Sequence, residues 1–208
     1  MLVLPGLIAG DATTVPLRRY LSRLGYLPHG WMQGVNLGPR VGVIERCLAD
    51  LGSLRRRTGR KVSLIGWSLG GVYARELAKA RPDDVRLVIT LGTPFTGHPK
   101  ATHAWRLYER LVGHPIGSPE LHEPLREPPP VPTTSVFSRS DGVVSWRCSL
   151  EPLGPRTESI EVHASHLGLG FNPLVHYAIA DRLAQPEGEW RPFTREGLRR
   201  RLYPDPYR

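Results

Sequence analysis

The sequence predicts an α/β fold, in which a mostly parallel sheet of about six strands carries helices on both faces. Short apolar runs of strand length alternate along the chain with segments whose apolar residues recur at helical spacing. The chain has 208 residues, of which 40% are hydrophobic and 23% are charged, a balance that excludes wholesale disorder. A chain of this size and composition can bury one sizeable core.

Six apolar runs are the expected strands: residues 2–4, 26–31, 62–65, 85–91, 133–137 and 159–162. The helical segments between them are expected at about 13–24, 41–58, 69–81, 101–112 and 172–184. Proline removes a ladder donor and is confined to sheet edges or bulges, so Pro28 predicts that the second run is an edge strand.

The expected domain organisation is a single body over residues 1–185 with one insertion at 96–131. Residues 113–132 are too rich in proline and glycine for regular structure, so this stretch is expected to be a long surface connection. Residues 186–208 turn polar and basic, and we interpret them as a strap on the surface.

The net charge of +9 comes from 28 Lys and Arg against 19 Asp and Glu, and we interpret the surplus as a solvated surface. No basic stripe is interleaved with aromatic residues, so no nucleic acid partner is expected. No apolar stretch approaches the roughly 20 residues that span a bilayer, so no integral membrane segment is expected.

The cellular location stays unknown from the sequence. The apolar start lacks the basic leader of a signal peptide, so a cytoplasmic location is the default expectation. A secreted location applies if the N-terminus has been processed. The two cysteines, Cys47 and Cys148, are too few for a disulfide framework, and whether they pair is left open.

The central chemical signal is the run Gly-Trp-Ser-Leu-Gly-Gly at residues 66–71, a G-x-S-x-G pattern directly after an apolar run and before a helical segment. A sharp turn there would hold Ser68 in a strained conformation above the carboxyl end of the sheet. The turn also points unpaired amides at developing negative charge. The alternative is a glycine-rich connection or phosphate-binding turn, and the missing lysine disfavours a P-loop.

A serine nucleophile needs a base that is itself oriented by an acid, and both follow in the chain. Asp141 comes after the apolar run at 133–137, although an ordinary Asp-Gly turn is the alternative there. His166 lies in the loop beyond the last strand and is the preferred base. His163 is the second choice, because it directly abuts that strand and is expected to serve a structural role.

The intermediate of such a reaction needs two oriented donors for its oxyanion. We expect the amide of Leu69, which follows the nucleophile, and the amide of Leu7, in the Pro-Gly-Leu loop after the first strand. The alternative for that loop is a plain Pro-Gly turn.

Within the insertion, the segment at 101–112 has an amphipathic pattern with Trp105 and Tyr108 on its apolar face. One interpretation is that this face merely packs on the body. The other is a small flap over an acyl pocket, in which Trp105 and Tyr108 contact the substrate.

Taken together, these motifs resemble the small α/β-hydrolase lipases and esterases that lack a large lid. The resemblance covers residues 1 to about 184 and includes Asn-Leu-Gly-Pro at 36–39, Leu-Gly-Thr-Pro at 91–94, Asp-Gly-Val at 141–143 and His-Leu-Gly-Leu at 166–169. It implies a minimal α/β-hydrolase fold and hydrolysis of small-molecule or lipid esters through an acyl-serine intermediate, without metal or organic cofactor. Pro5 stands where many members have histidine.

Two alternatives accompany this expectation. An acyltransferase or thioesterase would use the same three side chains and differ only in the acceptor, which desolvation and pocket shape decide. A noncatalytic binding protein would keep the fold without the chemistry, because fold alone never proves function.

Overall fold

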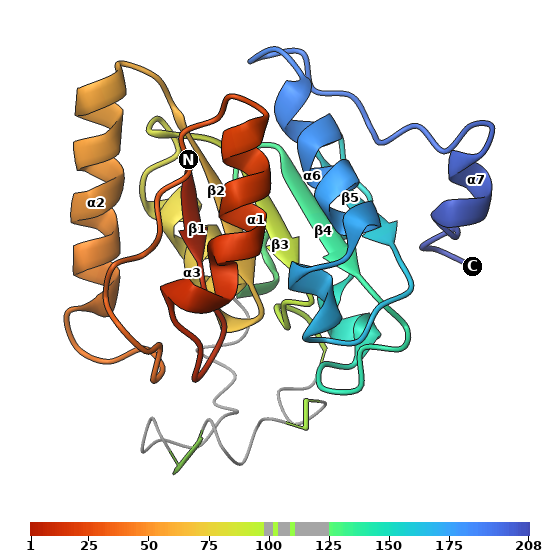
Figure 1. The fold of residues 1–208 in the computed structure, drawn as a ribbon, viewed down its shortest axis with the longest axis horizontal. Coiled ribbons are helices and arrows are strands. Elements are labelled where there is room, and N and C mark those ends of the chain that lie inside the picture. The colour runs from red at the N-terminus through yellow and green to blue at the C-terminus, as the bar shows by residue number, and fades with distance from the viewer. Residues whose placement is uncertain (98–101, 104–108, 111–124) are drawn as a thin grey trace.

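The computed structural model describes residues 1–97, 102–103, 109–110 and 125–208. Their strands form one five-stranded sheet in the order β1-β2-β3-β4-β5, and every neighbouring pair is parallel (Figure 1). The strands are β1 (Leu2–Leu4), β2 (Val62–Trp67), β3 (Val85–Leu91), β4 (Thr133–Phe137) and β5 (Thr157–Glu161).

Helices cover both faces of this sheet, which confirms the predicted fold class (Figure 1). One face packs against α1 (Asp11–Arg23) and α6 (Pro173–Ala184), and the other against α2 (Val43–Thr58) and α3 (Leu69–Ala80). The strands are buried on both sides, as in other parallel sheets, and successive residues therefore enter different cores.

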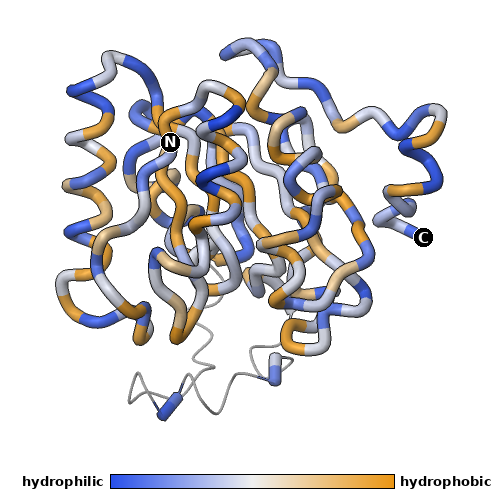
Figure 2. The backbone as a smooth tube through the Cα atoms, in the orientation of Figure 1, coloured by the Kyte–Doolittle hydropathy of each residue, from blue (hydrophilic) through white to orange (hydrophobic). Residues whose placement is uncertain are grey.

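The amphipathic helix α2 illustrates how the sequence pattern builds one of these cores. Figure 2 shows hydrophobic and hydrophilic positions alternating along α2, as expected for a helix with one buried face. Its buried residues are Val43, Cys47, Leu51 and Leu54.

The sequence prediction of a strand at 26–31 is wrong. The segment pairs with β1 through a single bridge between His29 and Leu2. This bridge lies at the edge of the sheet, which is where Pro28 predicted that the segment would lie. The carboxylate of Asp11, in α1, accepts hydrogen bonds from the amides of Trp31 and Met32, both at 2.9 Å. These amides are therefore turned away from the strand ladder, and the pairing stops after one bridge.

After α6 the chain passes to the side of the sheet beyond β5 and forms the short helix α7 (Arg199–Leu202) before the C-terminus (Figure 1). Phe193 and Tyr203 from this segment are buried in the same core as α6, with their rings edge to face at 4.8 Å between centroids. Most of the helix expected at 101–112 lies outside the described residues. Across the described part of the chain, helices fall short of the length and apolarity that crossing a membrane requires.

Cys47 and Cys148 are both free, buried thiols. Burial raises the pKa of Cys47 from 9.0 to about 11 and also raises the pKa of Cys148. The Cys47 shift contributes stability that is fully present below the unfolded pKa of 9.0 and is lost as the pH rises toward 11.

We therefore expect the folded protein to react slowly with a thiol reagent at pH 8, because the thiolate fraction of Cys47 there is about 100-fold below that of an exposed cysteine. In denaturant both thiols should react at once. Titration with a chromogenic disulfide, with and without urea, measures this. Rapid labelling of Cys47 in the folded protein would contradict the burial described here.

Candidate active site

The carboxyl ends of the five parallel strands all lie at the same end of the sheet. The chain leaves β1, touches its outer side at His29 and returns to its inner side as β2. Ligands of parallel α/β sheets bind outside the carboxyl ends of the strands, between the loops that follow two strands where the chain changes sides. The loop at Leu7 and the turn at Ser68 are these two loops.

Ser68 connects β2 directly to α3 in a strained backbone conformation, with φ 53° and ψ −122°. Non-glycine residues rarely occupy this region, and they persist there only when the surroundings hold them. The Ser68 amide donates to the carbonyl of Leu91 at 2.8 Å, and the Thr93 hydroxyl donates to the carbonyl of Ser68 at 2.9 Å. The end of β3 therefore holds the turn at Ser68 on both sides.

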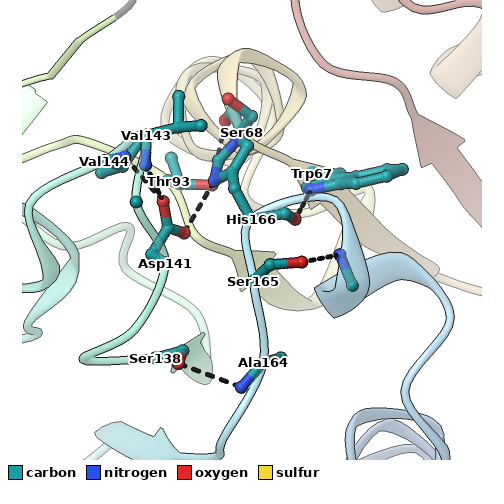
Figure 3. Close-up of polar contacts among 12 residues, drawn as sticks. Trp67, Ser68, Thr93, Ser138, Asp141, Val143, Val144, Ala164, Ser165 and His166 are labelled. Atoms are coloured by element: carbon teal, nitrogen blue, oxygen red, sulfur yellow. Dashed lines mark hydrogen bonds and ion pairs between the residues drawn. The ribbon is translucent and has the colours of Figure 1, made fainter.

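Asp141 and His166 form a buried, hydrogen-bonded pair. His166 Nδ1 lies 2.7 Å from Asp141 Oδ2, and the His166 amide donates to the Asp141 carbonyl at 2.8 Å. The other carboxylate oxygen, Oδ1, accepts from the amides of Val143 and Val144 at 2.9 and 2.6 Å. The loop thus fixes the carboxylate and leaves Oδ2 to orient the imidazole (Figure 3).

Gly92 lies between the Asp141–His166 pair and the turn at Ser68. It follows Leu91, which holds the Ser68 amide, and it has φ +53°. A Cβ on Gly92 would lie 2.9 Å from Asp141 Oδ2 and 3.1 Å from His166 Nδ1, so only glycine fits. Figure 3 shows the imidazole of His166 between the carboxylate of Asp141 and Ser68. The structure therefore brings the side chains of Ser68, Asp141 and His166 close together at the turn between β2 and α3.

The histidine loop packs against the residue before the serine. Trp67 Nε1 donates to the carbonyl of His166 at 3.2 Å, and the two rings lie 6.5 Å apart between centroids. His163, the second choice from the sequence, is exposed and does not reach Asp141, and its carbonyl accepts from Asn172 Nδ2 at 3.0 Å. The side chain of His163 is therefore not packed, and its expected structural role is limited to this backbone hydrogen bond.

The two expected amide donors lie on either side of the serine. Leu69 is the first residue of α3. The loop with Leu7 touches the serine directly, because a Cβ on Gly6 would lie 3.2 Å from Ser68 Cβ. Within the part of the chain that the structure describes, the amides of Leu7 and Leu69 make no hydrogen bond to a protein acceptor. Both amides are therefore left as hydrogen-bond donors within the described structure.

Trp105 and Tyr108, the expected substrate contacts, lie outside the described residues. Four residues close to them in the sequence are described: Thr102, His103, Glu109 and Arg110. The His103 amide donates to the Val143 carbonyl at 2.7 Å, and His103 Nδ1 lies 2.8 Å from the Gly142 carbonyl. This part of the insertion therefore contacts the loop of the acid. Among the described residues there is no group of three or more His, Cys, Asp or Glu side chains that could hold a metal ion.

Sequence reasoning about individual residues missed Gly92 and Thr93, which shape the site without taking part in the expected triad. Their signal was the Leu-Gly-Thr-Pro motif at 91–94, which contributed only to the resemblance. The way this motif shapes the site depends on contacts with residues that lie 25 or more positions away, such as the hydrogen bond from Thr93 to Ser68.

Comparison with solved structures assigns the chain to the α/β-hydrolase fold. A lipase from Bacillus licheniformis is 15% identical with a TM-score of 0.67, covering 86% of this chain and 89% of that one. A monoacylglycerol lipase from Paleococcus ferrophilus is 16% identical with a TM-score of 0.60, covering 86% and 91%. A pyrethroid hydrolase from Sphingobium faniae is 20% identical with a TM-score of 0.62, covering 89% and 97%. No family model and no curated protein matches the sequence.

Proposed function

We propose that this protein hydrolyses carboxylic esters, with Ser68 as nucleophile, His166 as general base and Asp141 as the acid that orients it. The observation that carries the proposal is the strained Ser68 turn beside a buried imidazole whose Nδ1 lies 2.7 Å from a carboxylate. Solved structures with the same fold include proteins named as lipases and as a pyrethroid hydrolase, which supports ester hydrolysis as the class of reaction.

In the first half of the reaction, Ser68 Oγ attacks the ester carbonyl carbon while His166 Nε2 takes the hydroxyl proton. The Asp141 carboxylate accepts a hydrogen bond from the Nδ1–H group and thereby stabilises the imidazolium that forms. The carbonyl oxygen becomes an oxyanion, and the amides of Leu7 and Leu69 donate to it. His166 then returns the proton to the leaving alcohol, and the acyl group stays on Ser68.

In the second half, a water molecule attacks the acyl-serine ester and His166 takes its proton. The second tetrahedral intermediate uses the same two amides. Its collapse releases the carboxylic acid and restores the proton to Ser68 Oγ. We propose small-molecule or lipid esters as substrates, with Trp105 and Tyr108 still predicted to contact the acyl group.

Incubation with a fluorophosphonate probe tests the nucleophile. We expect the wild type and Ser53→Ala, a matched serine variant in α2, to be labelled. Ser68→Ala should lose the label, because it removes the hydroxyl that lies next to the imidazole of His166 in Figure 3. Absence of label on folded wild-type protein would instead favour a noncatalytic binding protein.

A panel of p-nitrophenyl esters with increasing acyl length then tests the reaction and its substrate class. Product analysis with added alcohol or thiol separates hydrolysis from transfer, because a transferase forms a new ester in place of the free acid. Free acid as the main product supports the hydrolase, and a new ester or thioester as the main product contradicts it.

A further inference from the structure

The loop that follows β1 carries the Leu7 amide in an irregular backbone. Ile8 has φ 55°, a region that β-branched residues rarely occupy. The Ala9 amide donates to the Gly6 carbonyl at 3.2 Å and closes the turn. Since the N–H and C=O of one trans peptide point in opposite directions, this bond also orients the Leu7 amide. A loop with such strain persists only where other residues hold it.

Asn36 holds this loop from both sides. Its side chain is fully buried, and its Nδ2 donates to the carbonyl of Pro5 at 2.9 Å. Its backbone carbonyl accepts from the amide of Ile8 at 2.7 Å. These partners belong to the peptide groups immediately before and after the one that carries the Leu7 amide. Asn36 therefore fixes the peptide groups on both sides of that amide.

The same carboxamide is also tied to the helix that carries the other donor. Asn36 Oδ1 accepts from the Tyr73 hydroxyl at 3.2 Å, and Tyr73 lies in α3, one turn after Leu69. The start of α3 lies directly against the loop, because a Cβ on Gly70 would lie 2.3 Å from the Leu4 carbonyl oxygen. Asn36 thus connects the loop that presents Leu7 with the helix that presents Leu69.

We propose that Asn36 is a positioning residue that sets the spacing of the Leu7 and Leu69 amides for the oxyanion. The inference rests on the proposed function and adds to it a group that touches neither substrate nor the reacting atoms. Because the two amides act mainly on charge that develops in the transition state, displacing one lowers kcat more than it raises KM.

The variant Asn36→Asp keeps the shape and replaces the donor to Pro5 with an oxygen that repels the carbonyl. We expect kcat for p-nitrophenyl butyrate to fall about tenfold or more, with KM changing by less than about threefold. Tyr73→Phe keeps the ring stacked on Trp31 and the bond to Pro5, and removes only the hydroxyl. It should lower kcat by a smaller factor, and it tests the same link if Asn36→Asp does not fold.

Thr134→Val is the matched control, because Thr134 is equally buried in β4 and donates to Glu158 at 2.8 Å, away from the serine turn. It should lose stability and keep kcat. If neither variant lowers kcat more than this control, or if only KM rises, the positioning role is overturned while wild-type hydrolysis stands. If the wild type shows no hydrolysis that depends on Ser68, the proposed function fails and the positioning role fails with it.

Discussion

Replacing His166 with alanine should lower kcat for ester hydrolysis by at least about 1,000-fold. A serine hydroxyl is a weak nucleophile near neutral pH, and the variant would have no base to take its proton. The His166 side chain is only 9% exposed and is oriented by Asp141, so we expect water to replace it poorly. Steady-state rates with p-nitrophenyl butyrate, together with a circular dichroism spectrum that reports folding, measure the effect.

His163→Ala is the matched control from the same loop. His163 is exposed, and among the described residues its backbone carbonyl accepts a hydrogen bond from Asn172. Its variant should keep kcat within about twofold of the wild type, as expected for a surface change away from the site. A large loss in His163→Ala with a small one in His166→Ala would reverse the assignment of the base.

The second large effect concerns stability and the buried ion pair of Arg75 and Glu151. Arg75 lies in α3, and Glu151 precedes β5. Both side chains are almost fully buried. Arg75 also donates to the carbonyl of Glu127 at 3.1 Å and stacks over Phe95 at 3.8 Å. Burial raises the pKa of Glu151 and lowers the pKa of Arg75, which reflects the desolvation cost that their attraction offsets.

Arg75→Met should lower the free energy of unfolding by about 3 to 5 kcal/mol, because it leaves the Glu151 carboxylate buried without its cation. Urea denaturation followed by fluorescence measures this value. A loss below about 1 kcal/mol would show that the carboxylate finds another partner or protonates easily, contrary to the expected cost.

The double variant Arg75→Met with Glu151→Leu separates the pair from the packing. Within the described part of the chain, Arg75 Nε and Glu151 Oε2 have no hydrogen-bond partner, so the pair is incompletely satisfied. Removing both charges should therefore recover most of the stability that the single variant loses. A double variant no more stable than Arg75→Met would mean that packing around Arg75, rather than the unpaired charge, carries the effect.

The fold class was predictable because its signals are local. Each strand of a parallel sheet is a short apolar run, and each covering helix shows an apolar face at helical spacing, as in α2. The serine turn was predictable for the same reason, since its G-x-S-x-G pattern lies within one strand, one turn and the start of one helix, although the end of β3 also holds it.

The segment at 26–31 was not predictable from its own residues. Its aromatic and apolar residues suggest a strand. However, the amides of Trp31 and Met32 donate to the carboxylate of Asp11, which lies about 20 positions earlier in the chain. Asn36 was recognisable only as part of a motif, because its partners Pro5 and Tyr73 lie 31 and 37 positions away.

The sequence by itself determined where strands and helices alternate, that a serine stands at a strand-to-helix turn, and which acid and which histidines follow in order. Only the tertiary structure decided that His166 rather than His163 meets Asp141, and that Asn36 joins the two amide-bearing segments. The reason is physical: backbone propensity acts over a few neighbouring residues, whereas hydrogen bonds such as that of His166 with Asp141 connect positions 25 apart and form only once the chain has packed.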